Sequence, residues 1–132
     1  MSALIIRVRT AQVPTLVTVA GDIDLLTAPQ LRDQIRTLPD GDVVLDISGV
    51  RLLAAVGLRV LLELHDHRAR AGAQVVLVAA RPPVQRVLCV TGLDETLPMS
   101  ATIEDAVAFV RGTQARQGQC LAFPRRRLPR VT

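Results

Sequence analysis

Apolar and polar residues follow two different periods along this chain. Residues 4–10 and 15–21 alternate with the two-residue period of strands that are buried on one face. Pro14 lies in the short link between them, so the two segments are expected to form a hairpin. Further along, continuous apolar runs are typical of strands that are buried on both faces. The expected strands span residues 4–10, 15–21, 42–47, 74–80 and 97–100.

The second period is helical and fills the intervals between the later strands. Thr27 is the expected N-cap of the first helix, with Gln30 closing a capping box. The second helix is expected to bury one face. The members of that face are Leu58, Leu61, Leu62, His65 and Ala69. The expected helices span residues 28–38, 56–71, 84–90 and 103–111.

This order of strands and helices predicts an α/β fold in one domain. A mixed sheet of about five strands, antiparallel only at the initial hairpin, would be flanked by about four helices. We place this domain at residues 1–112, because residues 113–132 lack a periodic apolar face. The C-terminal segment is expected to be a basic, flexible tail. Its arginines are Arg116, Arg125, Arg126, Arg127 and Arg130.

The composition fits a globular domain and limits the classes of partner. Hydrophobic residues make up 49% of the 132 residues, but aromatic residues only 2%. So few aromatic rings disfavour a binder of single-stranded nucleic acid, which stacks bases on such rings. The tail's arginines exceed the formal net charge of +4, so a nucleic-acid role would depend on the tail alone. Without a signal-peptide core or an apolar run of ~18 residues, we expect a cytoplasmic protein that does not enter a membrane.

Two cysteines are the next candidates for chemistry. Cys89 and Cys120 show neither metal-binding spacing nor a C-x-x-C motif. Cys89 shares an apolar stripe with its neighbours in the third helix, so we expect it to be buried. A redox pair between the two cysteines stays open as an alternative, although cytosolic disulfides are rare. No set of residues suggests a metal site, a cofactor or a catalytic nucleophile, which argues against an enzyme.

The most informative segment runs from Leu45 to Leu62. A buried strand is followed by an expected turn at residues 48–50, then by a tight loop and a helix that begins near Gly57. Such a loop lies at the carboxyl end of a strand and at the positive end of a helix. In α/β sheets this is where ligands and partners bind, so the segment is the candidate functional surface.

This segment resembles the phosphorylation motif of STAS-domain anti-sigma factor antagonists, in which Asp-Ser-Ser-Gly-Leu opens a helix. Residues 21–28 resemble that family's Gly-Glu-Leu-Asp segment and the Thr-Ala helix start after it. Residues 82–93 resemble its short helix and Gly-Leu turn. The three matches occur in the family's order, and the resemblance covers roughly residues 4–111. It implies a STAS fold with most helices on one face of the sheet.

The resemblance also implies a non-enzymatic function, the binding of a histidine-kinase-like anti-sigma factor. The implied partner surface consists of Asp24, Ala54, Ala55, Val56, Gly57 and Leu58. Ala55 occupies the position of the serine that accepts phosphate in the family, and Ala54 replaces the preceding aspartate. Because alanine has no hydroxyl, control by phosphorylation is not expected at this position.

Two interpretations of this loop stay open. In one, the chain binds its anti-sigma factor constitutively; in the other, the loop has lost that partner. The alternative function is a non-enzymatic scaffold or a small-ligand-sensing STAS module in another signalling complex. The oligomeric state is also open, with a weak homodimer among the alternatives.

Overall fold

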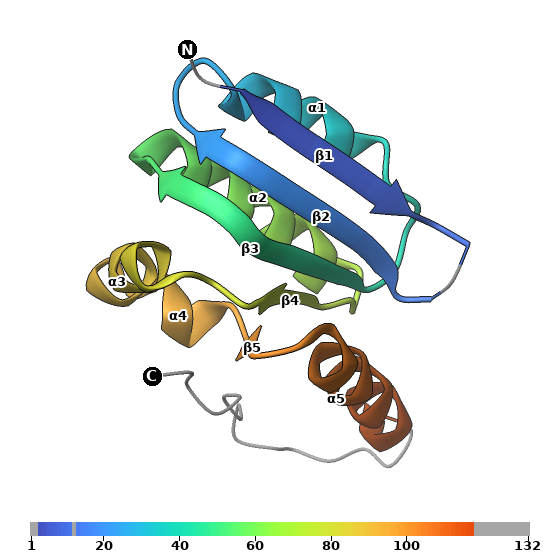
Figure 1. The fold of residues 1–132 in the computed structure, drawn as a ribbon. Coiled ribbons are helices and arrows are strands. Elements are labelled where there is room, and N and C mark those ends of the chain that lie inside the picture. The colour runs from blue at the N-terminus through green and yellow to red at the C-terminus, as the bar shows by residue number, and fades with distance from the viewer. Residues whose placement is uncertain (1–2, 12, 118–132) are drawn as a thin grey trace.

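The computed structural model contains five strands and five helices in the described part of the chain. Figure 1 shows how these elements are arranged. The structure describes residues 3–11 and 13–117, with side chains as far as Gly112. The strands are β1 (Leu4–Arg9), β2 (Thr15–Ile23), β3 (Val43–Leu53), β4 (Val75–Val78) and β5 (Met99–Ser100). The helices are α1 (Ala28–Arg36), α2 (Ala55–Arg70), α3 (Pro82–Val90), α4 (Leu93–Thr96) and α5 (Ile103–Gln117). The predicted α/β fold with a mixed sheet is confirmed.

The sheet has the order β1-β2-β3-β4-β5, so strands that follow one another in sequence lie side by side. β1 and β2 pair antiparallel, as expected for the initial hairpin, and the other pairs are parallel. β3 is the central strand, and its first residues, Val43, Val44 and Leu45, are all buried. The buried Asp42 helps to align β3 with β4, because its Oδ1 accepts a hydrogen bond of 2.7 Å from the Gln74 amide.

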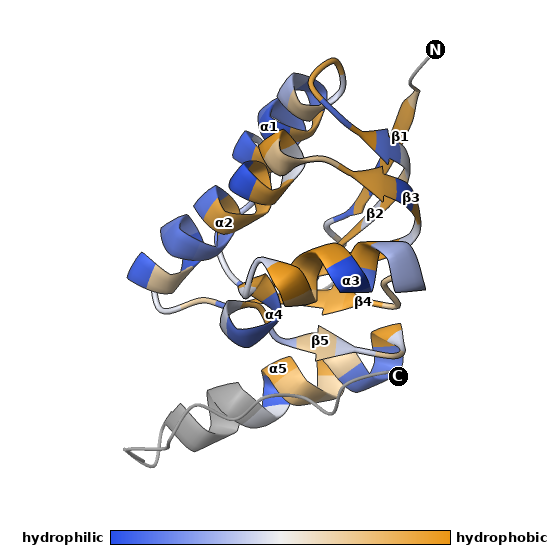
Figure 2. Cartoon of the chain, turned by 90° about the vertical axis from the view of Figure 1, so that its left-hand side faces the viewer, coloured by the Kyte–Doolittle hydropathy of each residue, from blue (hydrophilic) through white to orange (hydrophobic). Residues whose placement is uncertain are grey.

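The helices cover the two faces of the sheet unequally (Figures 1 and 2). One face packs against α1, α2 and α3 and contains the larger part of the core. Its strand residues are Val17, Val19, Val43, Leu45, Ile47, Val75 and Leu77. The other face packs against α5 and contributes Leu16, Val44, Val76 and Val78. Because both faces of β3 and β4 are covered, successive residues in these strands are apolar rather than alternating.

The turn predicted at Ser48–Gly49–Val50 is wrong, because β3 continues through these residues as far as Leu53. β2 continues beside it, with Ala20 opposite Gly49. A Cβ added to Gly49 would lie 2.7 Å from the Ala20 Cβ. Glycine is therefore required here for the close approach of two strands, not for a turn.

The helices also differ in detail from the sequence prediction. α2 begins at Ala55, not near Gly57, and its buried face is rotated from the predicted one. The buried residues of α2 are Gly57, Val60, Leu61, Leu64 and Arg68, whereas Leu62 and Ala69 are exposed. The short helix α4 is not predicted by the sequence pattern, and α5 extends to Gln117, past residue 112 where we placed the end of the domain.

The expected capping box of α1 is wrong as well. Thr27 is the N-cap residue, but its side chain makes no capping hydrogen bond to the helix. The Gln30 side chain instead donates to the carbonyl of Leu4, at 3.1 Å. Gln30 therefore links α1 to the first strand, which a local motif cannot reveal.

Ala79, directly after β4, has a φ of +58°, in the left-handed region. Replacing it by glycine should raise the free energy of unfolding by about 0.5–1 kcal/mol. The left-handed conformation costs an L-residue about 1–2 kcal/mol, and the greater freedom of glycine in the unfolded chain offsets part of that gain. Urea unfolding followed by circular dichroism measures the change.

Ala71→Gly is the matched control, because Ala71 is exposed and has a φ of −91°. The free energy of unfolding of this control should fall by up to about 1 kcal/mol, since glycine there adds only freedom to the unfolded chain. Equal losses in both variants would show that Ala79 carries no strain.

Candidate functional site

The carboxyl ends of β2 and β3 lie side by side and bring the two predicted parts of the site together. Ile23 is the register partner of Leu53 at the ends of these strands. One residue later, the Ala54 amide donates a hydrogen bond of 2.9 Å to the Ile23 carbonyl. This bond joins the β2–α1 loop, which contains Asp24, to the N-cap of α2. The family resemblance implied one partner surface that contains both segments, and in the structure the two segments are neighbours (Figure 1).

The first turn of α2 exposes only part of the predicted surface. Ala54 is the N-cap in an extended conformation, and its carbonyl accepts hydrogen bonds from the Gly57 and Leu58 amides at 2.9 and 3.1 Å. Ala55 is exposed, Val56 and Leu58 are half-buried against the core, and Gly57 is buried. Of the residues in this turn, Ala55 therefore offers its side chain most fully to a partner.

Gly57 holds α2 close to the ends of both strands. A Cβ added to it would lie 2.5 Å from the Ile23 Cγ2 atom and 2.7 Å from a Leu53 Cδ atom. Both neighbours are buried core side chains with little room to move. A larger residue would therefore push the start of α2 away from the sheet.

Asp24 shapes the β2–α1 loop from within. Its Oδ1 accepts hydrogen bonds from the Leu26 and Thr27 amides at 3.0 and 3.1 Å. The Thr27 hydroxyl donates to the Asp22 carbonyl at 2.7 Å and accepts from the Asp24 amide at 2.9 Å. Thr27 is buried and Asp24 is half-buried, so both maintain the loop conformation. A direct contact of Asp24 with a partner stays a prediction.

The exposed leucines of this region are functional candidates that sequence reasoning missed. Leu25 and Leu26 in the β2–α1 loop are 75% and 80% exposed, and Leu52 near the end of β3 is 50% exposed. Together with Ala55 they form what we call the apolar rim, at the carboxyl ends of neighbouring strands. Large exposed apolar side chains at this end of a sheet are candidates for an interaction surface. The sequence signal that could have revealed this surface is the pair of adjacent leucines, Leu25 and Leu26, inside a turn.

Two arginines make polar contacts with residues of β2 and β3. Arg51 forms an ion pair with Asp22, with 3.5 Å between its Nε and the Oδ1 atom. The Arg81 Nε donates a hydrogen bond of 2.7 Å to the Ser48 carbonyl and so links the start of α3 to β3. The ion pair is mainly solvent-exposed and contributes little to stability. Its consequence is that the acidic Asp22 next to the rim is locally neutralised.

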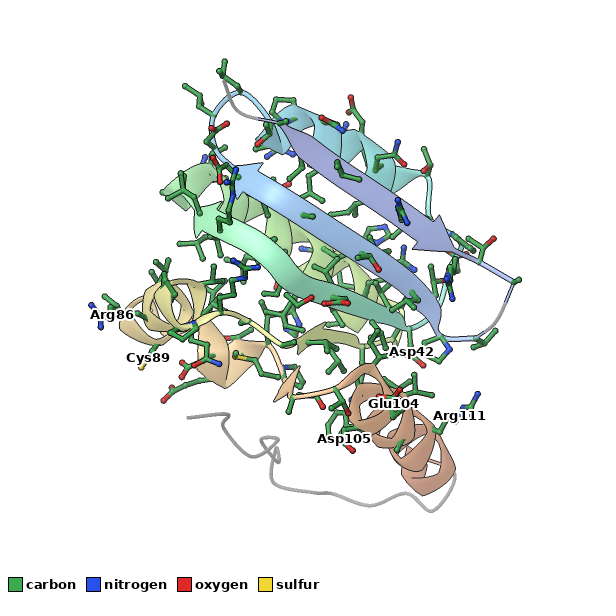
Figure 3. The ribbon with its side chains drawn as sticks, viewed as in Figure 1. Asp42, Arg86, Cys89, Glu104, Asp105 and Arg111 are labelled. Atoms are coloured by element: carbon green, nitrogen blue, oxygen red, sulfur yellow. The ribbon has the colours of Figure 1, made fainter. Side chains whose placement is uncertain are left out.

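The structure corrects the expectation for Cys89, which is exposed on α3 (Figure 3). α3 buries Val84 and Leu88, four residues apart, and Cys89 follows on a different side of the helix. Adjacent apolar residues in a helix do not share a face, which is why the stripe argument was wrong. Cys120 lies outside the described residues, so the redox pair stays a prediction.

In residues 3–11 and 13–117, no group of three or more His, Cys, Asp or Glu side chains is arranged to hold a metal ion. None of the helices in this part of the chain is both long and apolar enough to cross a membrane.

Comparison with known proteins covers both parts of the site. The family model described as "Mlab, STAS domain" matches residues 6–101. This chain belongs to the STAS domain family. The anti-sigma-F factor antagonist RsfB of Mycobacterium tuberculosis is 32% identical to this STAS domain over 98 residues, which are 72% of this chain and 80% of RsfB.

Solved structures agree with this assignment. An anti-sigma factor antagonist from Mycobacterium paratuberculosis has a TM-score of 0.73 and 32% identity, covering 83% of this STAS domain chain and 95% of its own. Unphosphorylated SpoIIAA, another anti-sigma factor antagonist, has a TM-score of 0.69 over 82% of this chain and 97% of its own. Its identity of 17% shows a common fold only. The resemblance inferred from three sequence motifs is therefore confirmed.

We expect Gly57→Ala to lower the free energy of unfolding by about 1–3 kcal/mol, because its methyl group overpacks the contact with Ile23 and Leu53. Gly112→Ala in α5 is the control, since nothing lies within 4 Å of its added Cβ. That change should be neutral or gain up to about 1 kcal/mol from helix propensity. Thermal unfolding of both variants is the measurement, and a Gly57→Ala variant as stable as the unmodified chain would contradict the proposed packing role.

Proposed function

We propose that this STAS domain is an anti-sigma factor antagonist that binds its anti-sigma factor through the apolar rim and the first turn of α2. The exposure of Leu25, Leu26, Leu52 and Ala55 at one edge of the sheet is the observation that carries the proposal. Related proteins of 32% identity bear the name anti-sigma factor antagonist, which supports the class of partner. The partner surface would include the predicted residues Ala54, Val56, Leu58 and Asp24. Gly57, also predicted, is buried and would serve only to position the turn. The function is binding, not catalysis.

We further propose that the partner is of the kinase-like type and that binding is constitutive. A phosphate at this position would add about −1.5 to −2 charges to an apolar surface. Ala55 has no hydroxyl to accept it. Thr27, the nearby hydroxyl in the β2–α1 loop, is buried and bonded on both sides, which keeps it from a kinase. Ser48 is the residue of β3 whose hydroxyl is exposed, so it is the alternative acceptor that a phosphorylation experiment has to test.

A charge at position 55 tests the binding surface. Ala55→Glu should weaken binding of the anti-sigma factor by roughly 30- to 1,000-fold, because an apolar contact would have to desolvate a carboxylate at a cost of about 2–4 kcal/mol. The fold should survive, since a negative charge near a helix N-terminus is favourable by about 0.3–1 kcal/mol. Calorimetric titration against the source organism's anti-sigma factor, with circular dichroism as the folding check, measures both.

Ala69→Glu is the matched control, because Ala69 is an exposed alanine on the same helix, near its other end. It should leave the affinity unchanged. If Ala55→Glu and the unmodified chain bind with equal affinity, the partner surface lies elsewhere. A chain that binds no anti-sigma factor at all would favour the scaffold or sensor alternative.

Incubation with a kinase-type anti-sigma factor and ATP should leave residues 54–56 unmodified. Peptide mapping by mass spectrometry is the measurement, and Ala55→Ser is the positive control. We expect that variant to accept phosphate weakly, because the neighbouring aspartate of the family motif is Ala54 here. Phosphate on Ser48 of the unmodified chain, lost in Ser48→Ala, would show that a switch exists by another route and would disprove constitutive binding.

A further inference from the structure

A cavity of about 470 Å³ lies between α1 and α2. It is lined by the later residues of both helices and by the segment after α1, whereas the apolar rim lies where the two helices begin. Its apolar walls are Ile35, Leu38, Val60 and Leu64. Small-molecule sites are concave, mainly apolar and of this size, with a few polar groups that orient the ligand.

Arg68 lines this cavity and is only 4% exposed. Its Nη1 donates hydrogen bonds to the carbonyls of Pro39 and Gly41 at 2.6 and 2.9 Å. Its Nε is buried and has no hydrogen-bond partner among the described residues. No carboxylate in the described part of the chain forms an ion pair with it. A buried charge normally needs a counter-ion, but among the described residues Arg68 has only the two carbonyls as partners.

The other charged groups of the cavity leave an excess of positive charge. Arg32 and Glu63 form an ion pair, with 3.2 Å between the Nε and Oε2 atoms, and so largely neutralise each other. Arg36 and Arg68 then face a single acid, the exposed Asp40. The cavity therefore combines an apolar wall with a cationic end.

We propose that this cavity binds a small organic anion with an aliphatic body. Its carboxylate or phosphate group would pair with Arg68 and Arg36, and its aliphatic part would lie against Ile35 and Leu64. Arginine suits this role because its planar guanidinium presents several donors to carboxylate or phosphate oxygens. This site is separate from the apolar rim and does not depend on the function proposed for the rim.

Titration of the isotope-labelled full chain, followed by amide NMR, tests the site. Octanoate and octyl phosphate are the two anionic probes, and 1-octanol and inorganic phosphate are the controls that lack one half of the ligand. We expect saturable shifts at the amides of Arg36, Leu64 and His67 with at least one anionic probe. Both controls should bind roughly tenfold more weakly or not at all. The stronger anionic probe identifies the head group.

Two results would overturn the proposal. One is the absence of saturable shifts with both anionic probes at millimolar concentration. The other is an equal response to inorganic phosphate, which would reduce the site to a general attraction of anions.

Variants locate the site without disturbing the buried Arg68. Arg36→Gln removes an exposed cation of the lining and should weaken binding of the tighter-binding anionic probe by roughly fivefold or more. Arg70→Gln is the matched control, because Arg70 is exposed on α2 and does not line the cavity. Ala55→Glu should bind the probe normally, which separates this site from the rim. Equal weakening by Arg36→Gln and Arg70→Gln would contradict a defined site.

Discussion

The structure depends on parallel pairing of β2 and β3 as far as their last residues. The pairing ends at Ile23 and Leu53 and is closed by the hydrogen bond from the Ala54 amide to the Ile23 carbonyl. Two glycines make the close approach possible: Gly49 lets β3 lie against Ala20, and Gly57 lets α2 rest on both strand ends. The same contacts place the β2–α1 loop beside the start of α2. The proposed partner surface therefore depends on these strands staying paired to their ends, through two shifts of register.

Most of the fold could be predicted because burial imposes a period on the sequence. The hairpin, the central β3 and the α/β order follow from alternating and continuous apolar runs. Two of the errors occurred where the deciding contact is distant in sequence. Gly49 suggests a turn locally, but the neighbouring β2 keeps it in a strand. Gln30 suggests a capping box, but it bonds to Leu4 in the first strand. Local motifs are reliable only when no tertiary partner competes for the same group.

The candidate site was predicted in part, for a similar reason. Ala54 to Leu58 and Asp24 were expected to lie together, and the hydrogen bond at Ala54 joins their segments. The leucines at 25, 26 and 52 were not expected, because exposure is a property of the folded surface and not of a residue type. The hydrogen bonds that Asp24 accepts from the loop amides likewise become apparent only in the folded structure. The cavity between α1 and α2 leaves no sequence signal, since its cations are spread over two helices.

If a ligand in the cavity changes partner binding at the apolar rim, α1 and α2 have to transmit that change. Both helices begin at the rim and reach the cavity with their later residues, so they are the elements that the two sites share. A ligand shifts a conformational equilibrium only by its difference in affinity for the two states. Here those states would differ in the packing of α1 on α2, where the Arg32–Glu63 pair is partly exposed and therefore weak. The buried Leu31 and Leu61, one in each helix, resist such a movement more strongly.

Coupling between sites is typically about 1–3 kcal/mol, which would require the ligand to bind one packing arrangement about 5- to 150-fold more tightly than the other. A protein without an acceptor hydroxyl at position 55 would then still have a route by which a small molecule changes partner binding, through helix packing instead of added charge.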